Sequence, residues 1–301
     1  LETISVHSPN PPIFWIISFL TENVVPWTRW LVYVRKRPFE SWIFPKTKYE
    51  IILDNSNPDI IISNSQRCPI RKDLVKSVTF FHTGENYRPN YSQYDYTFAF
   101  DRLEDRRHIR VTSLSYYGLK RFIKNYDTYD INDIFNKKTK FCCFLVSNPG
   151  CRTRNKFFEK LNKYKKVDSG GRYKNNIGRR IISNTPWVKE YKFIITFENG
   201  SYPGYCTEKI GVGFKANTIP IYWGDETVNV DYNDKSFINC HNYSNFDEAI
   251  QKIIELDNND EMYKNMLLQP WLKDNKIQYE LSDEYYIKRF NSLLDEISNK
   301  L

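Results

Sequence analysis

The apolar residues of this chain fall into short runs that polar, turn-rich segments separate. In the first half these runs predict five strands, at residues 49–53, 60–63, 78–81, 96–100 and 109–114, with a helix that closes over residues 73–78. Residues 120–140 are rich in Lys, Asn and Asp and show no apolar periodicity. This stretch therefore predicts a linker between two halves.

The second half alternates strands and helices. Apolar runs predict strands at residues 141–146, 193–197 and 218–223. Apolar stripes predict helices at residues 154–164, 245–256 and 283–297. The alternation predicts an α/β protein with two doubly wound domains. We expect an N-terminal domain over residues 1–125, a linker over 126–140, a second domain over 141–280 and a C-terminal helix over 281–301.

Composition supports packed domains and leaves several partners open. Hydrophobic residues make up 41% of the 301 residues and aromatic residues 16%, which excludes a disordered chain. Most of these rings are expected in the cores, although tyrosines and tryptophans also suit a sugar-binding cleft. The net charge of +8 favours a polyanionic partner, such as nucleic acid, a membrane surface or a sugar nucleotide.

The basic residues occur in short groups rather than in one massed patch, and no zinc-finger, helix-turn-helix or RNA-recognition signature accompanies them. This argues against nucleic-acid binding as the main function and leaves it as the least favoured interpretation, while peripheral contact with a membrane surface through the basic groups stays open. The apolar run 13–20 is too short to span a bilayer, so no transmembrane span is expected. The six cysteines form no CxxC pair and are expected to be reduced.

The stretch 197–224, FENGSYPGYCTEKIGVGFKANTIPIYWG, is the most informative part of the chain. It predicts a strand, a loop rich in Gly, Asn and Tyr over residues 198–205, a helix that Thr207 caps, and a second strand. Glu208 lies in the first turn of that helix, where a carboxylate is favoured. A polar loop between a strand's carboxyl end and a helix's amino end binds nucleotides in open α/β sheets. The stretch therefore predicts a ligand site for a phosphate.

Three motifs carry a resemblance to a known family. The first is FEN, a Gly/Tyr loop, Tyr-x-Thr-Glu-Lys and IPIYWG within residues 197–224. The second is FFHTGEN at residues 80–86 followed by Pro-Asn-Tyr at 89–91. The third is Val-Ser-Asn-Pro at 146–149 with Arg-Asn at 154–155 and Phe-Phe at 157–158. In this order the motifs closely resemble those of the α1,3-fucosyltransferases that use GDP-fucose, and the similarity covers roughly residues 50–265.

The resemblance implies a GT-B fold, in which two Rossmann-like domains face each other across a cleft, with the donor in the second. It implies an inverting transfer of L-fucose from GDP-fucose to a hydroxyl, O3 of N-acetylglucosamine, in a Lewis-type or protein-bound glycan acceptor. No Asp-x-Asp metal motif lies at a strand end, and residues 130–133 are the nearest approach. No metal site or cofactor is therefore expected, with Mn or Mg acting only as stimulators of such enzymes.

Sugar transfer needs a base for the acceptor hydroxyl and cations for the leaving diphosphate. The resemblance assigns the base to Glu85, which follows a strand and would face a desolvating cleft, with His82 as the other acceptor-side residue. It assigns the diphosphate to Arg154 and Lys209, with Arg152 as a competitor of Arg154. Glu208 is expected to recognise the donor's hydroxyls and to support charge at the anomeric carbon, which makes it the third catalytic candidate.

Asn199 and Tyr205 would complete the donor site by hydrogen bonding from the loop. Two other interpretations stay open at this point. One is a GT-B enzyme that uses another GDP-sugar, since nothing physical in the loop selects fucose. The other is a non-catalytic glycan- or nucleotide-binding protein on the same scaffold. The location expected is the cytoplasm for a microbial or viral protein, and the Golgi lumen for a trimmed eukaryotic catalytic region.

Overall fold

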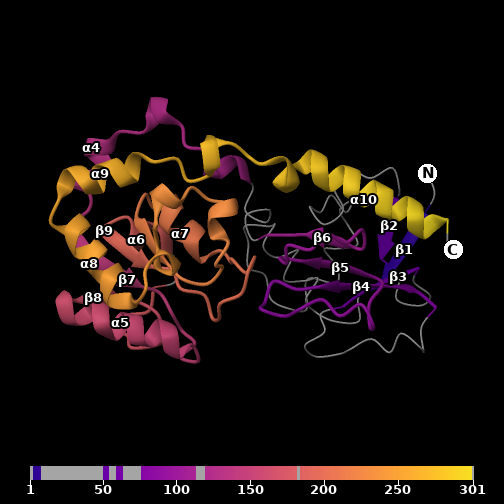
Figure 1. Ribbon diagram of the computed structural model, residues 1–301, viewed down its shortest axis with the longest axis horizontal. Helices are drawn as coiled ribbons and strands as arrows, with labels where there is room; N and C mark the ends of the chain where they lie inside the picture. Colours follow the sequence, from indigo (N-terminus) through magenta and orange to yellow (C-terminus); the bar gives the residue numbers. More distant parts are fainter. Residues whose placement is uncertain are drawn as a thin grey trace. The chain divides into compact units, whose positions relative to one another are not determined.

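The computed structural model describes residues 3–7, 50–53, 59–63, 76–112, 119–181 and 184–299. The chain divides into two compact units, each with one parallel sheet (Figure 1). Unit 1 consists of residues 1–117 and 278–301, and unit 2 of residues 118–277. The prediction of an α/β protein built on parallel sheets is confirmed.

Unit 1 contains a six-stranded parallel sheet in the order β2-β1-β3-β4-β5-β6. Its strands are β1 (Thr3–His7), β2 (Glu50–Leu53), β3 (Ile60–Ser63), β4 (Val78–His82), β5 (Tyr96–Ala99) and β6 (His108–Arg110). The sheet packs against α10 (Asp283–Ser298), whose buried face includes Phe290 and Leu294. Phe98 of β5 stacks on Phe290 with ring centroids 5.0 Å apart.

Helix α10 comes from the C-terminal end of the chain, so unit 1 is built from two distant segments. The sequence predicts this helix correctly but treats it as a separate C-terminal element. It begins at Ser282, whose side chain accepts a hydrogen bond from the Tyr285 backbone N–H. Tyr286 then donates a hydrogen bond from its hydroxyl to the Arg110 carbonyl at the end of β6. The helix is therefore part of the first unit's core.

Unit 2 contains a five-stranded parallel sheet in the order β11-β10-β9-β7-β8. Its strands are β7 (Lys140–Phe144), β8 (Val167–Ser169), β9 (Tyr191–Ile195), β10 (Ile219–Tyr222) and β11 (Ile238–Asn239). Its α-helices are α4 (Ile131–Asn136), α5 (Arg152–Tyr164), α6 (Asn184–Val188), α7 (Lys209–Lys215), α8 (Phe246–Asp257) and α9 (Asp260–Leu268). Single 3₁₀ turns connect several of these elements.

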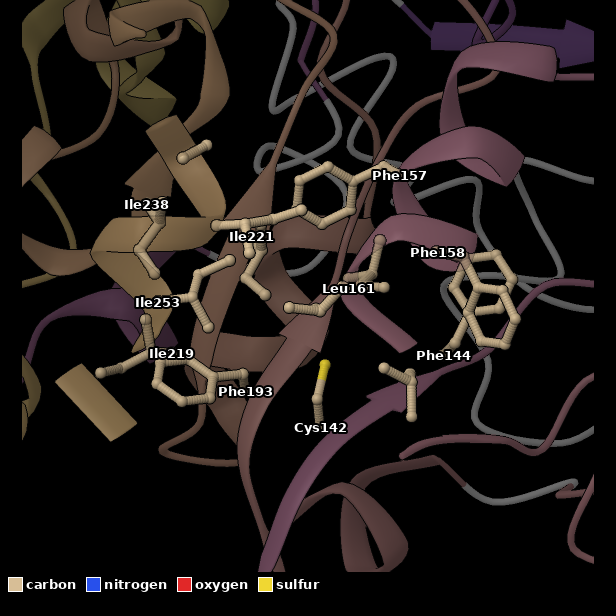
Figure 2. Close-up of a cluster of buried hydrophobic side chains, with 14 of the residues drawn as sticks. Cys142, Phe144, Phe157, Phe158, Leu161, Phe193, Ile219, Ile221, Ile238 and Ile253 are labelled. Atoms are coloured by element: carbon tan, nitrogen blue, oxygen red, sulfur yellow. The ribbon is translucent and has the colours of Figure 1, made fainter. Parts of the chain in front are cut away.

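The main core of unit 2 lies between the sheet and helices α5 and α8. Figure 2 shows its centre, where Cys142 and Phe144 of β7 and Phe193 of β9 meet Phe157 and Leu161 of α5. The predicted stripes on these two helices are confirmed, since Ala249, Ile250 and Ile253 of α8 are buried in the same cluster. The five cysteines that the structure describes are free and buried, as expected for reduced thiols in a core.

The predicted linker lies within unit 2. Residues 126–140 contain the 3₁₀ turn η4 (Tyr126–Thr128) and helix α4, which packs against α9 through Phe135 and Tyr263. Lys138 is buried, and its ammonium donates to the Thr218 hydroxyl at 2.8 Å and to two backbone carbonyls. The sequence hides this packing because its apolar residues Ile131, Ile134 and Phe135 are confined to one short helix, and the end of the segment is held by the polar side chain of Lys138.

The predicted strands agree with the sheets to within two or three residues in the described part of the chain. The sequence misses β1, β8, β11 and the short helices α4 and α9. These are elements of two to nine residues, whose periodicity is too brief to detect. Residues 73–75 of the helix expected at 73–78 lie outside the described residues, and residues 76–78 are not helical but lead into β4. The apolar run 13–20 lies wholly outside the described residues.

Leu161 offers a test of the unit 2 core. Its side chain is fully buried between the sheet and α5, so Leu161→Ala should lower the free energy of unfolding by about 2–5 kcal/mol. Urea unfolding monitored by circular dichroism measures this loss. The exposed Lys163→Ala on the same helix should change stability by less than about 0.5 kcal/mol. Equal midpoints for the two variants would contradict the position of the core.

Candidate active site

The residues expected to hold the donor lie at one edge of the unit 2 sheet. Strands β7, β9 and β10 are parallel, so their carboxyl ends lie at the same edge. Three loops leave this edge, over residues 145–151, 196–208 and 223–227. Arg154 lies just beyond the first loop, Asn199, Tyr205 and Glu208 lie in or at the end of the second, and Lys209 begins α7.

Arg154 links two of these loops from inside the protein. Arg154 is only 1% exposed. One guanidinium nitrogen donates to Asn199 Oδ1 at 2.8 Å and to the Phe197 carbonyl at 3.4 Å, while the other donates to the Asn148 carbonyl at 2.8 Å. Its Nε is buried and has no hydrogen-bond partner among the described residues. Burial lowers the pKa of Arg154, which the charge of Glu198 opposes.

Arg152 and Arg154 occupy different faces of α5. Arg154 is buried on the face that packs toward the sheet, as are Phe157 and Phe158. Arg152 is exposed on the helix surface. Because α5 has 3.6 residues per turn, two positions along the chain turn a side chain by about 200°. Arg154, and not Arg152, therefore reaches the loop that carries Asn199.

Lys209 is held by Glu198, a buried carboxylate at the start of the loop predicted over residues 198–205. The ammonium of Lys209 donates to Glu198 Oε2 at 2.9 Å and to Thr207 Oγ1 at 2.7 Å. The Glu198 side chain is fully buried, whereas that of Lys209 is 25% exposed. Burial alone would lower the pKa of Lys209, but the charges of Glu198 and Glu208 outweigh it and raise that pKa.

Thr207 does not cap α7 as predicted. Its backbone N–H donates to Glu198 Oε1 at 2.8 Å and its hydroxyl to Glu198 Oε2 at 2.7 Å. Glu208 is the residue at the N-cap, and its side chain makes no capping hydrogen bond. The local preference of threonine for helix caps is overridden here, because a buried carboxylate needs donors more than the helix start does. A glutamate directly after the apolar run 193–197 is the signal that could have revealed Glu198.

A second buried carboxylate, Asp225, fixes the middle of the donor loop. Its Oδ1 accepts from the Gly204 backbone N–H at 2.6 Å, from the Thr227 N–H at 2.8 Å and from the Thr227 hydroxyl at 2.7 Å. Gly204 has φ +87°, a conformation that favours glycine. The Tyr222 hydroxyl accepts from the Asp225 N–H at 2.9 Å and donates to the Tyr205 carbonyl at 3.4 Å. The loop is therefore built before any ligand arrives.

The other predicted donor residues differ in accessibility. Asn199 and Glu208 are exposed at the surface of the edge. Glu208 Oε1 lies 3.7 Å from the Lys209 ammonium. Tyr205 is only 1% exposed, so its ring is part of the loop's interior. The structure thus brings Arg154, Asn199, Glu208 and Lys209 to one edge of one sheet.

Glu85 lies in unit 1, in a tight turn after β4. The backbone N–H of Glu85 donates to the Thr83 hydroxyl at 3.0 Å, and the backbone carbonyl of Glu85 accepts from the Tyr87 N–H at 2.7 Å. The position after a strand is as predicted, but the side chain is exposed.

His82 is a buried residue at the end of β4. Its Nδ1 lies 3.1 Å from the Phe98 carbonyl, and because a carbonyl only accepts, Nδ1 carries the hydrogen. Burial lowers the pKa of His82 to about 4, and the hydrogen bond to Phe98 opposes this shift in part. His82 is thus neutral at physiological pH and ties β4 to β5.

Asp130, in the acidic segment 130–133, forms hydrogen bonds with backbone N–H groups. Asp130 Oδ1 accepts from the Asn132 and Asp133 N–H groups and caps α4. Within the described ranges, no group of three or more His, Cys, Asp or Glu side chains has the arrangement of a metal site.

Comparison with known proteins decides the family. The sequence profile described as "Glycosyltransferase family 10 (fucosyltransferase) C-term" matches residues 135–299, more than half of the chain. The chain belongs to glycosyltransferase family 10. A second profile, described as "Alpha-(1,3)-fucosyltransferase FucT N-terminal domain", matches residues 39–117. This confirms the family that the three motifs indicate.

Individual members of glycosyltransferase family 10 show the same relationship. The chain is 35% identical to the Helicobacter pylori "Alpha-(1,3)-fucosyltransferase FucT" over 218 residues, which cover 62% of this chain and 46% of that protein. It is 28% identical to the human "4-galactosyl-N-acetylglucosaminide 3-alpha-L-fucosyltransferase 9" over 144 residues, 46% of this chain and 38% of that protein. The matches thus span less than half the length of these curated relatives.

Solved structures agree with the fold. A crystal structure described as "alpha1,3-Fucosyltransferase with GDP-fucose" superposes with a TM-score of 0.76 at 25% identity and covers 98% of this chain and 91% of that one. The predicted GT-B class is confirmed for this family 10 chain. None of the helices in the described ranges combines the length and apolar character needed to cross a bilayer.

The titration of His82 gives a test of the unit 1 site. Its pKa is about 4 in the folded protein and 6.5 when unfolded, so the folded state disfavours the proton. Neutral His82 therefore contributes about 3 kcal/mol to the free energy of unfolding. This contribution is complete above pH 6.5 and is lost as the pH falls toward 4. His82→Gln should therefore show a shallower loss of unfolding free energy than the wild type over this range. Parallel curves in urea titrations at pH 7, 5.5 and 4 would contradict the buried neutral imidazole.

Proposed function

We propose that this family 10 chain transfers L-fucose from GDP-fucose to O3 of an N-acetylglucosamine unit in a glycan. The proposal rests on one observation above all: two cationic side chains, Arg154 and Lys209, converge on the carboxyl edge of a parallel sheet around Glu198. Two similarities support the choice of donor and linkage, namely that to the Helicobacter pylori α1,3-fucosyltransferase and that to the solved α1,3-fucosyltransferase with GDP-fucose.

Arg154 and Lys209 would bind the diphosphate. A guanidinium fork suits two phosphate oxygens and an ammonium acts as a point charge. Both side chains contact the loop after β9, Arg154 through Asn199 Oδ1 at 2.8 Å and Lys209 through Glu198 Oε2 at 2.9 Å, so both cations lie at the same edge of the sheet. Asn199, Tyr205 and Glu208 complete the donor site, with Glu208 exposed at the edge where the sugar would lie.

The chemistry that follows is a single displacement. The acceptor oxygen attacks the anomeric carbon as its bond to the β-phosphate oxygen breaks, and GDP leaves with the electron pair. Glu85 takes the proton from the acceptor hydroxyl. Arg154 and Lys209 stabilise the charge that develops on the diphosphate. β-Linked GDP-L-fucose would in this way give an α-fucoside without a covalent intermediate.

The first test is an assay of GDP release with N-acetyllactosamine-type acceptors. We expect release with GDP-fucose and much less with GDP-mannose or GDP-glucose at equal concentration. Incorporation of labelled fucose into the acceptor should match the GDP released. Equal turnover with another GDP-sugar would contradict the choice of donor. GDP binding without any transfer would favour a non-catalytic role on the same scaffold.

Glu85→Gln tests the general base. The amide keeps the shape of the side chain but cannot accept the proton, so kcat should fall by about 10²- to 10⁴-fold. The affinity for GDP should be unchanged, because Glu85 and the diphosphate site belong to different units. Glu104→Gln, an exposed carboxylate of the same unit, is the matched control and should keep full activity. Unchanged kcat in Glu85→Gln would remove this residue from the mechanism.

A further inference from the structure

We propose that Glu198 is a positioning residue that aims the ammonium of Lys209 at the diphosphate. This inference rests on the proposed function, because it assumes that Lys209 binds the diphosphate. It adds a residue whose role comes from its contacts in the structure alone.

Among the residues that the structure describes, the hydrogen bonds of Lys209 leave one of its donors free. An ammonium carries three N–H groups. One is directed to Glu198 Oε2 at 2.9 Å and a second to Thr207 Oγ1 at 2.7 Å. Glu208 Oε1, at 3.7 Å, is too far to accept a hydrogen bond. With two donors fixed, the direction of the third is fixed as well.

Glu198 itself cannot move easily. Its two carboxylate oxygens accept from the Thr207 N–H, the Thr207 hydroxyl and Lys209, and its own backbone N–H donates to the Trp223 carbonyl at 2.8 Å. The side chain lies directly against Gly224. A Cβ added at Gly224 would come within 2.4 Å of Glu198 Cγ, so only glycine leaves room for this side chain.

Glu198, Thr207 and Lys209 form a hydrogen-bonded triangle. The negative charge of Glu198 in this triangle argues against the view that Glu198 serves only to strengthen the electrostatic attraction of the diphosphate. A carboxylate beside Lys209 weakens the positive potential that attracts a diphosphate. It also keeps the lysine charged, since burial would otherwise lower its pKa. The gain is orientation: a long lysine side chain is held in one geometry before the nucleotide binds.

The test is the affinity of the intact protein for GDP, measured by isothermal titration calorimetry from pH 7 to pH 10. Glu198→Gln keeps the size of the side chain but replaces an acceptor oxygen by an NH₂ group. It should raise the Kd for GDP by about 10- to 100-fold at pH 7. The affinity of this variant should also begin to fall at lower pH than that of the wild type. The charged groups that face Lys209 in the variant are then Glu208 and Arg154.

Four further variants distinguish a positioning role of Glu198 from a role in folding alone. If Glu198 acts through Lys209, adding Glu198→Gln to Lys209→Gln should change the Kd by less than about twofold. Thr207→Val removes the neutral member of the triangle and should raise the Kd in the same direction, which tests the inference even if Glu198→Gln does not fold. The exposed Glu255→Gln is the control and should bind GDP normally.

Unchanged GDP affinity in Glu198→Gln or, if that variant does not fold, in Thr207→Val, would overturn the inference, as would fully additive losses in the double variant. The proposed function fails by a different result, namely GDP binding by the wild type without transfer of fucose. The two outcomes can therefore be distinguished.

Discussion

A buried carboxylate must form its hydrogen bonds within the protein, because water cannot supply them. The candidate site of this family 10 chain depends on the hydrogen bonds of one such carboxylate, Glu198. Its oxygens accept from Thr207 and Lys209, and its charge also acts on Arg154. Burial raises the pKa of the Glu198 carboxyl, while the Lys209 charge opposes that shift. One buried anion thus holds the loop after β9, the start of α7 and the ammonium of Lys209 in a single arrangement.

The rest of unit 2 makes that arrangement possible. Parallel strands bring their carboxyl ends to one edge, so the loops after β7, β9 and β10 must meet there. The core between the sheet, α5 and α8 fixes the start of α5, from which Arg154 reaches Asn148 and Asn199. Asp225 fixes the other side of the donor loop through Gly204 and Thr227. Packing of the core and hydrogen bonding of the loops therefore act on the same few side chains.

Much of this could be predicted from the sequence, because the informative patterns are local. Apolar runs of four or more residues located most strands and the long helices, and the alternation of the two gave the fold class. The motifs placed Arg154, Asn199, Glu208 and Lys209 near one another, and the structure brings these four to one edge.

What the sequence could not reveal depends on contacts between distant segments. α10 completes the core of unit 1 from the far end of the chain, and no local pattern shows which unit a helix joins. The segment 126–140 is predicted as a linker because its apolar residues are confined to the short helix α4, while the polar side chain of Lys138 anchors its end. Glu198 reads as a loop residue, and Thr207 as a helix cap, because their partnership exists only once the loop has folded back.

The most direct measurement of the central claim is a crystal structure of the protein with GDP. We expect phosphate oxygens within hydrogen-bonding distance of the Arg154 guanidinium and of the Lys209 ammonium, with the contact between Lys209 and Glu198 kept. A nucleotide bound elsewhere on the unit 2 sheet, or a diphosphate that contacts neither cation, would contradict the account.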